Sequence, residues 1–263
     1  MKFITSVLVL IPFLGGTAQV AEAYDDYNAF YASRPGAIFD QPVEADHDTL
    51  YSDRKGIHAT LTGPINGKIA HISVYANHVT INGKSFSYSR AITFPGEHAS
   101  PIDPGSAAVF VTSRTRARPS VLCVEGDSNG SGEADRHKQI YLLIDPLAHQ
   151  GKPSFLHLPS LFSSCRAIRK TKNTRLAFPK NTYLFDSAEK SRVGLLISYY
   201  TFTNQRFVPT PDAIRLRFAQ PEIPFEFSLE ADKESLDTDI GAENRTSVGA
   251  SLTIQTTRGY VST

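Results

Sequence analysis

The chain has 263 residues and a formal net charge of +1 at pH 7. A nearly neutral chain lacks the basic excess of nucleic-acid-binding proteins, so we expect no nucleic-acid partner. After the N-terminal segment no apolar run approaches the roughly 20 residues that span a bilayer, so the mature chain should hold no transmembrane segment. Its length is ample for one domain with a sizeable core.

The first element predicted in chain order is an export signal. Lys2 supplies a positive charge, residues 3–14 (FITSVLVLIPFL) are mostly apolar, and residues 21–23 (AEA) form a small-residue cleavage pattern. These features indicate a signal peptide over residues 1–23. We therefore expect the mature chain to begin at Tyr24 and to be exported, to the periplasm or outside the cell.

Strand patterns dominate the mature chain. One helix is expected, over residues 24–31 (YDDYNAFY), because its aromatic side chains could share one helical face. Most other segments alternate between apolar and polar positions or are rich in β-branched and aromatic residues, which favours strands. In chain order the expected strands cover residues 57–62, 68–74, 78–81, 85–94, 107–112, 121–125, 139–144, 154–158, 183–185, 193–203, 213–218, 225–229 and 251–255.

The tetrapeptide INGK occurs twice, at residues 65–68 and 81–84. Asn-Gly between alternating runs predicts a tight hairpin, because both central residues must adopt positive φ. We therefore expect an all-β fold, as an antiparallel sandwich, a barrel or a small propeller, in a single domain over residues 24–263. Residues 230–249 begin with an acidic stretch and are expected to form a mobile loop.

Two cysteines occur, Cys123 and Cys165. In an exported protein such a pair predicts a disulfide. Closing a loop of about 43 residues would stabilise the fold by about 4 kcal/mol in the chain-entropy model. The alternative is two free thiols, one of which could act as a nucleophile.

Residues 126–130 (GDSNG) fit the G-x-S-x-G pattern of a serine nucleophile. The segment CVEGDSNGSG also resembles the C-x-G-D-S-G-G segment of chymotrypsin-like proteases, which are secreted all-β enzymes. That resemblance would make Ser128 the nucleophile of a hydrolase. The chain has an extra residue after Cys123 and Asn129 in place of glycine, and it lacks that family's A-A-H-C histidine motif.

The same loop is also a candidate metal site. Asp127, Asn129 and Ser131 are spaced so that their oxygens could converge on one cation, with Gly132 permitting the sharp turn. The spacing resembles the D-x-[DN]-x-[DN]-G-x-x-D calcium hairpins of integrin-type propellers. That resemblance implies Ca²⁺ as a cofactor, held by Asp127, Asn129, Ser131, Glu133 and Asp135. An EF-hand is excluded, because Lys138 stands where its last glutamate would be, and a metal-free turn uses the same residues.

A basic run covers residues 165–175 and contains no acid. Arg166, Arg169, Lys170, Lys172 and Arg175 could meet an acidic partner surface, although a solvated loop has the same composition. With no catalytic set evident, we expect an exported, non-enzymatic binding protein whose partner is a protein, for example an inhibitor or a toxin-immunity protein. The alternatives are a secreted serine hydrolase that uses Ser128 and a structural module of the envelope.

Overall fold

The computed structural model describes residues 22–39, 41–43, 50–115, 119–128, 136–147, 153–171, 173 and 175–230. The expected acidic loop beyond Glu230 and the expected strand 251–255 lie outside these residues, as do residues 1–21 of the expected signal peptide. The predicted cleavage position falls inside the first strand, β1 (Ala23–Tyr24). Among the described residues, no helix is both long enough and apolar enough to cross a membrane.

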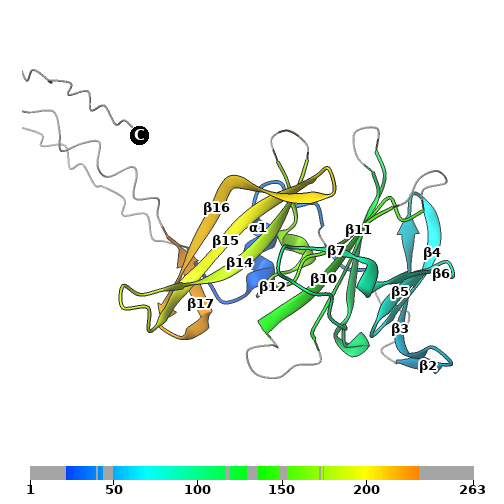
Figure 1. Ribbon diagram of the computed structural model, residues 1–263, viewed down its shortest axis with the longest axis horizontal. Coiled ribbons are helices and arrows are strands. Elements are labelled where there is room, and N and C mark those ends of the chain that lie inside the picture. The colour runs from blue at the N-terminus through cyan, green and yellow to red at the C-terminus, as the bar shows by residue number, and fades with distance from the viewer. Residues whose placement is uncertain are drawn as a thin grey trace, which may run out of the picture. The chain divides into compact units, whose positions relative to one another are not determined.

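The described chain folds into antiparallel sheets, which confirms the all-β prediction (Figure 1). The first sheet is a five-stranded meander. Its strands are β2 (Tyr51–Asp53), β3 (Gly56–Ile65), β4 (Lys68–Tyr75), β5 (His78–Ile81) and β6 (Lys84–Ser87). Both Asn-Gly turns have the predicted conformation, since φ is 55° at Asn66, 74° at Gly67, 49° at Asn82 and 81° at Gly83.

The second sheet has the strand order β7-β11-β10-β9-β8, and β12 pairs with β10 beside it. Only the β7–β11 pair is parallel among the pairs described. The strands are β7 (Ile92–Thr93), β8 (Ala108–Thr112), β9 (Val121–Gly126), β10 (His137–Ile144), β11 (Ser154–His157) and β12 (Ser160–Leu161).

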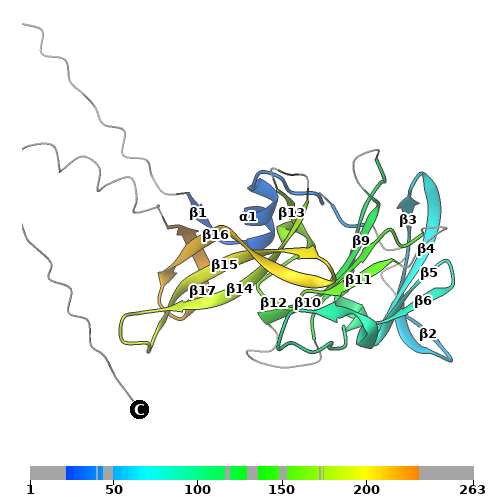
Figure 2. The same ribbon diagram turned by 45° about the horizontal axis from the view of Figure 1, so that its top comes forward.

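The third sheet has the order β1-β17-β16-β15-β14-β13. Besides β1 its strands are β13 (Arg169–Lys170), β14 (Leu176–Phe185), β15 (Arg192–Thr203), β16 (Arg206–Gln220) and β17 (Ile223–Leu229). The helices are α1 (Tyr27–Ser33) and the short 3-10 turns η1 (Tyr88–Arg90), η2 (Pro104–Ser106) and η4 (Cys165–Ala167). Figures 1 and 2 show α1 beside this sheet, where Phe30 and Tyr31 join the core cluster of Leu195 and Tyr199.

The second sheet is buried on both faces. Leu122 and Val124 point into the core shared with the first sheet, whereas Val121 and Cys123 point into a core that includes Phe178 of the third sheet. This double burial explains why β9 is a continuous apolar run, because neither face meets water. It also gives the fold a layered, sandwich-like packing. Cys123 and Cys165 form the predicted disulfide in the second of these cores.

Several predicted elements have the wrong bounds, among them the helix and the strand expected over residues 85–94. The helix begins at Tyr27, because the Asp26 side chain caps it by accepting hydrogen bonds from the amides of Asn28 and Ala29. Tyr24 lies in β1 instead. The strand expected over residues 85–94 is interrupted by η1, which turns Tyr88 inward to stack on Tyr141 with ring centroids 3.9 Å apart. Burying that ring outweighs continuing the strand.

Candidate functional site

A groove of about 520 Å³ lies where the end of β9 and the start of β10 meet the entry to α1. Its lining comes from segments far apart in the sequence and combines carboxylates, cations and aromatic rings. The residues that line it are Asp25, Asp26, Tyr27, Asn28, Glu125, Arg136, Lys138, Phe162, Ser163 and Phe225.

Glu125 is the most deeply placed carboxylate of the groove. Its Oε2 accepts hydrogen bonds from the Ser164 hydroxyl at 2.9 Å and from the Cys165 amide at 2.5 Å. Burial raises the pKa of this carboxyl, and the two hydrogen bonds oppose that rise. No donor among the described residues reaches the other oxygen, Oε1, which leaves it available as an acceptor.

Ser163 supplies a second available group. It is only 4% exposed, and its hydroxyl has no hydrogen-bond partner in the described structure. Buried hydroxyls are normally satisfied, so an orphan in a groove lining indicates a place for a ligand atom or a water molecule. The disulfide brings the two groups together, because Glu125 follows Cys123 by two positions and Ser163 precedes Cys165 by two.

Aromatic rings form one wall. Tyr27 stacks on Phe162 with centroids 4.8 Å apart and an interplanar angle of 7°. The Tyr27 hydroxyl donates to the Pro224 carbonyl at 2.9 Å, and the neighbouring Phe225 is 59% exposed. Phe162 has a φ of 45°, in the left-handed region that costs energy for a residue with a large side chain. The backbone therefore holds this ring in place at some cost.

The two cations of the groove already have partners within the protein. Lys138 forms an ion pair with Asp127. The Arg136 guanidinium donates to the Tyr183 hydroxyl at 3.2 Å and lies 6.0 Å from the Phe162 ring centroid. Asp26 is similarly occupied as the cap of α1. Among the groups that remain available, Glu125 Oε1 and the Asp25 carboxylate are acceptors, the Ser163 hydroxyl can accept or donate, and the Asn28 side-chain amide does both.

The described start of the predicted nucleophile and metal loop, residues 126–128, follows Glu125 of the groove lining directly. This start is anchored, because the Asp127 amide donates to the Ser106 hydroxyl at 2.8 Å and its carbonyl accepts from the Asp103 amide at 2.9 Å. Gly126 is required by packing, since a Cβ there would lie 2.4 Å from Ile102 Cγ2. Ser128 is partly buried. The next described element is the strand β10, and no helix of the nucleophile-elbow type follows within the described residues.

The other predicted metal ligands, Asn129, Ser131, Glu133 and Asp135, lie outside the described residues. The described part of the chain contains no group of three or more candidate metal ligands. The Asp127 carboxylate forms an ion pair with Lys138, so a metal cation that binds Asp127 would compete with Lys138. The calcium site stays a prediction.

The calcium hypothesis makes a measurable prediction. About 10 mM calcium, ten times a millimolar dissociation constant, should stabilise the protein by about 1.4 kcal/mol relative to EDTA. The melting temperature would rise by about 3–6 °C for a domain of this size. Asp127→Ala should abolish the rise, and Lys138→Gln should enlarge it by releasing the carboxylate. Equal melting temperatures in calcium and EDTA would exclude the site.

The basic run does not form one uniform patch. Arg169 lies 3.8 Å from the Tyr199 ring centroid and pairs with Asp212, so it is part of the fold. Arg166 lies over Phe110 and donates to Gln41. Lys170 and Arg175 are exposed, and Lys172 lies outside the described residues. Among the described members only Lys170 and Arg175 are exposed, and a role of this run in partner binding stays a prediction.

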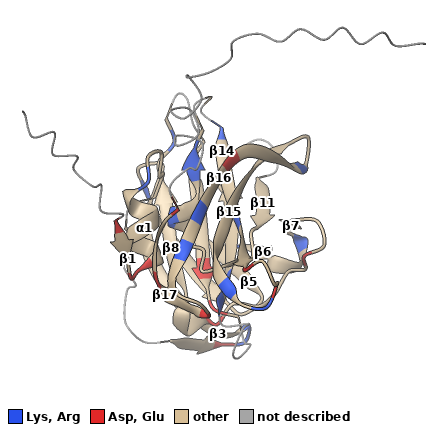
Figure 3. Ribbon diagram, turned by 90° about the vertical axis from the view of Figure 1, so that its left-hand side faces the viewer, with Lys and Arg blue, Asp and Glu red and all other residues tan. Residues whose placement is uncertain are grey.

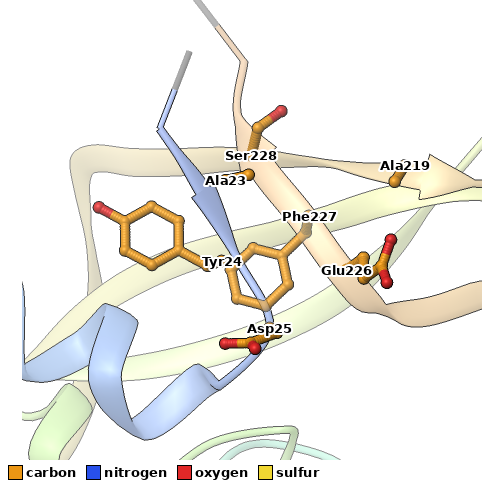
Figure 4. A pocket seen from close by; sticks show the side chains of 7 residues that line it. All are labelled: Ala23, Tyr24, Asp25, Ala219, Glu226, Phe227 and Ser228. Atoms are coloured by element: carbon orange, nitrogen blue, oxygen red, sulfur yellow. The ribbon is translucent and has the colours of Figure 1, made fainter. Parts of the chain in front are cut away.

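Two other surfaces have weaker features. Figure 3 shows basic residues along β14, β15 and β16, but several of them already form ion pairs with acids, namely Lys180–Glu97, Arg192–Glu222 and Arg215–Glu230. A groove of about 460 Å³ lies beside β1 and β17 and includes Tyr24, Glu226 and Phe227 (Figure 4). No orphaned buried polar atom belongs to its described lining.

Comparison with protein-family models, with curated proteins and with solved structures gives no match. The functional inference therefore depends on the residues of the site alone. Sequence reasoning missed Glu125, Ser163, Tyr27 and Phe162. The signal that could have found the first two was the predicted disulfide, which places the neighbours of Cys123 close to those of Cys165.

Proposed function

We propose that this chain is an exported, non-enzymatic binding protein and that the groove around Glu125 and Ser163 holds part of its partner. The observation that carries the proposal is the orphaned, buried Ser163 hydroxyl beside an available carboxylate oxygen and an exposed aromatic ring. Buried polar groups without partners are rare, and aromatic anchors commonly dominate binding surfaces. The disulfide supports export, because such bonds persist in oxidising compartments.

The alternative function that names a catalytic residue is a secreted hydrolase with Ser128 as its nucleophile. A fluorophosphonate probe separates the two, because it labels activated serines. We expect no labelling of the purified mature chain. Labelling that Ser128→Ala removes would replace the binding proposal by the hydrolase.

The binding function itself is tested at Phe225. We expect the immobilised mature chain to capture one partner protein near equal stoichiometry from the native envelope fraction. Phe225→Ser should lower the affinity for that partner by about tenfold, because an exposed ring that anchors an interface contributes roughly 1–2 kcal/mol. Ile69→Ser is the matched control, since Ile69 is 73% exposed on β4, in the first sheet.

Ile69→Ser should therefore bind as the unaltered chain does. Equal loss in both variants, or in neither, would contradict a role for the groove. A structural envelope module would show no discrete partner and would fractionate with the envelope.

A further inference from the structure

We propose that the groove recognises a guanidinium or ammonium group carried on an alkyl chain, and that Glu125, Asp25 and Ser163 accept its hydrogen bonds. This inference rests on the proposed binding function and names the chemistry that the groove selects. Arginine and lysine side chains of a partner protein and free alkylamines share this chemistry.

The charge balance of the groove favours a cation. Three carboxylates line it, those of Asp25, Asp26 and Glu125, against the cations of Arg136 and Lys138. Beyond the lining, Asp127 pairs with Lys138 and Arg166 acts on Glu125, so four carboxylates stand against three cations. An anionic ligand would face this excess of negative charge, whereas a cationic ligand would reduce it.

The hydrogen-bonding inventory points the same way. Glu125 Oε1 and the Asp25 carboxylate can only accept when ionised, and the Ser163 hydroxyl can accept as well. A ligand that fits them must bring several donors. An ammonium group has three N–H donors and a guanidinium group has five, and hydrogen bonds from either to a carboxylate are stronger than those between neutral groups.

The aromatic wall suits the rest of such a ligand. The exposed ring of Phe225 offers a π face beside the acceptors. Tyr27 is stacked between Phe162 and Phe227, so this part of the wall adds apolar ring edges. Alkyl stems of lysine and arginine pack on apolar surface, and their cationic heads are attracted to ring faces. Arg136 already adopts this arrangement over Phe162 within the protein.

The test is a titration of the full mature chain with small probes, in which binding is measured by calorimetry and by amide NMR shifts. The probes are Nα-acetyl-arginine methylamide and Nα-acetyl-lysine methylamide. Their neutral counterparts are Nα-acetyl-citrulline methylamide and Nα,Nε-diacetyl-lysine methylamide. We expect at least one charged probe to bind at least about tenfold more tightly than its counterpart, because each charge-assisted hydrogen bond contributes more than a neutral one.

Variants locate the binding. Glu125→Gln keeps a carbonyl oxygen for the Ser164 and Cys165 donors but removes the charge, and it should weaken the charged probe by at least about tenfold. Asp25→Asn changes an exposed carboxylate and should also weaken binding of the charged probe. It replaces Glu125→Gln in the test if that variant does not fold. Ser163→Ala should weaken binding by a smaller factor. Glu97→Gln is the control, because Glu97 pairs with Lys180 away from the groove.

Equal binding of charged and neutral probes would overturn the inference, and so would no binding at millimolar concentrations. Free agmatine and a capped peptide with an internal arginine distinguish the two sources. Tighter binding of the peptide supports a protein side chain, and tighter binding of agmatine supports a free amine. If no cationic probe binds but Phe225→Ser still weakens partner binding, the inferred ligand chemistry is wrong and the proposed binding function stands. If the cationic probes bind but Phe225→Ser captures the partner as well as the unaltered chain does, the proposed binding function of the groove is wrong instead.

Discussion

Replacing both Cys123 and Cys165 by alanine is expected to lower the free energy of unfolding by about 4 kcal/mol, because the bond restricts the unfolded chain over a separation of 42 residues. Both residues are fully buried between the second and third sheets, so the loss includes core packing. The melting temperature of the double variant should fall by about 8–16 °C for a domain of this size.

The same change should loosen the groove, because the bond joins the segments that carry Glu125 and Ser163. Thermal melts of the double variant and of the unaltered chain with and without reductant provide the measurement. If the variant does not fold, the unaltered chain in reductant gives the same comparison. A melting temperature unchanged by both treatments would show that the disulfide contributes little.

Acidification below neutral pH is expected to destabilise the fold through His157. This side chain is 0% exposed and lies between Gln139, whose Oε1 is 2.8 Å from Nε2, and Thr93, whose hydroxyl is 3.1 Å from Nδ1. Tyr141 stacks on the imidazole at 4.5 Å. Burial lowers the pKa of His157 from 6.5 to about 4, because charging the ring in this core is unfavourable.

The direction of the effect is set by the two pKa values. The unfolded chain takes up the proton near pH 6.5 and the folded chain only near pH 4, so stability falls as the pH falls between these limits. A difference of about 2.5 pKa units corresponds to about 3 kcal/mol of stability, which is present above pH 6.5 and lost by the time the pH has fallen below 4.

Urea unfolding at a series of pH values measures this dependence. His157→Gln should be less stable at neutral pH, yet its further loss on acidification should be about 3 kcal/mol smaller than that of the unaltered chain. His98→Gln, at a position nearer the surface, should keep the original pH dependence. If His157→Gln and the unaltered chain lose equal stability on acidification, burial of His157 is not the cause.

The strands that could be predicted are those with a clear local pattern. The Asn-Gly hairpins are predictable because their turn requires positive φ at two adjacent residues, and β5 matches its predicted bounds. The disulfide was predictable from the cysteine pair and the expected export. Choosing the layered packing among sandwich, barrel and propeller needs the faces on which neighbouring sheets meet, which no local pattern gives.

Prolines led to the prediction of two strands that are too short. β14 and β16 are longer than predicted, because Pro179, Pro209 and Pro211 resemble breaks between strands in the sequence. β17 pairs with β16 only over residues 216–220, and β13 pairs with β14 only at residues 176–177. Pro209 and Pro211 therefore lie on a stretch of β16 with an open edge, where a missing N–H costs no ladder hydrogen bond. Pro179 lies where β13 no longer pairs with β14.

The groove could not be predicted for a related reason. Its lining joins residues 25–28, 125, 136–138, 162–163 and 225, which no spacing rule connects. The local motif at residues 126–135 indicates only the neighbouring loop. The cysteine pair alone carried information about the long-range contact.

The most direct test of a functional groove is displacement of the captured partner by a small probe. Nα-acetyl-arginine methylamide at a concentration that saturates the groove should release the partner from the immobilised chain, and the citrulline analogue should leave it bound. Release by the charged probe alone would show that the partner occupies the groove and that the groove recognises a cationic group. A partner that stays bound while the probe saturates the groove would show that the protein binds it elsewhere.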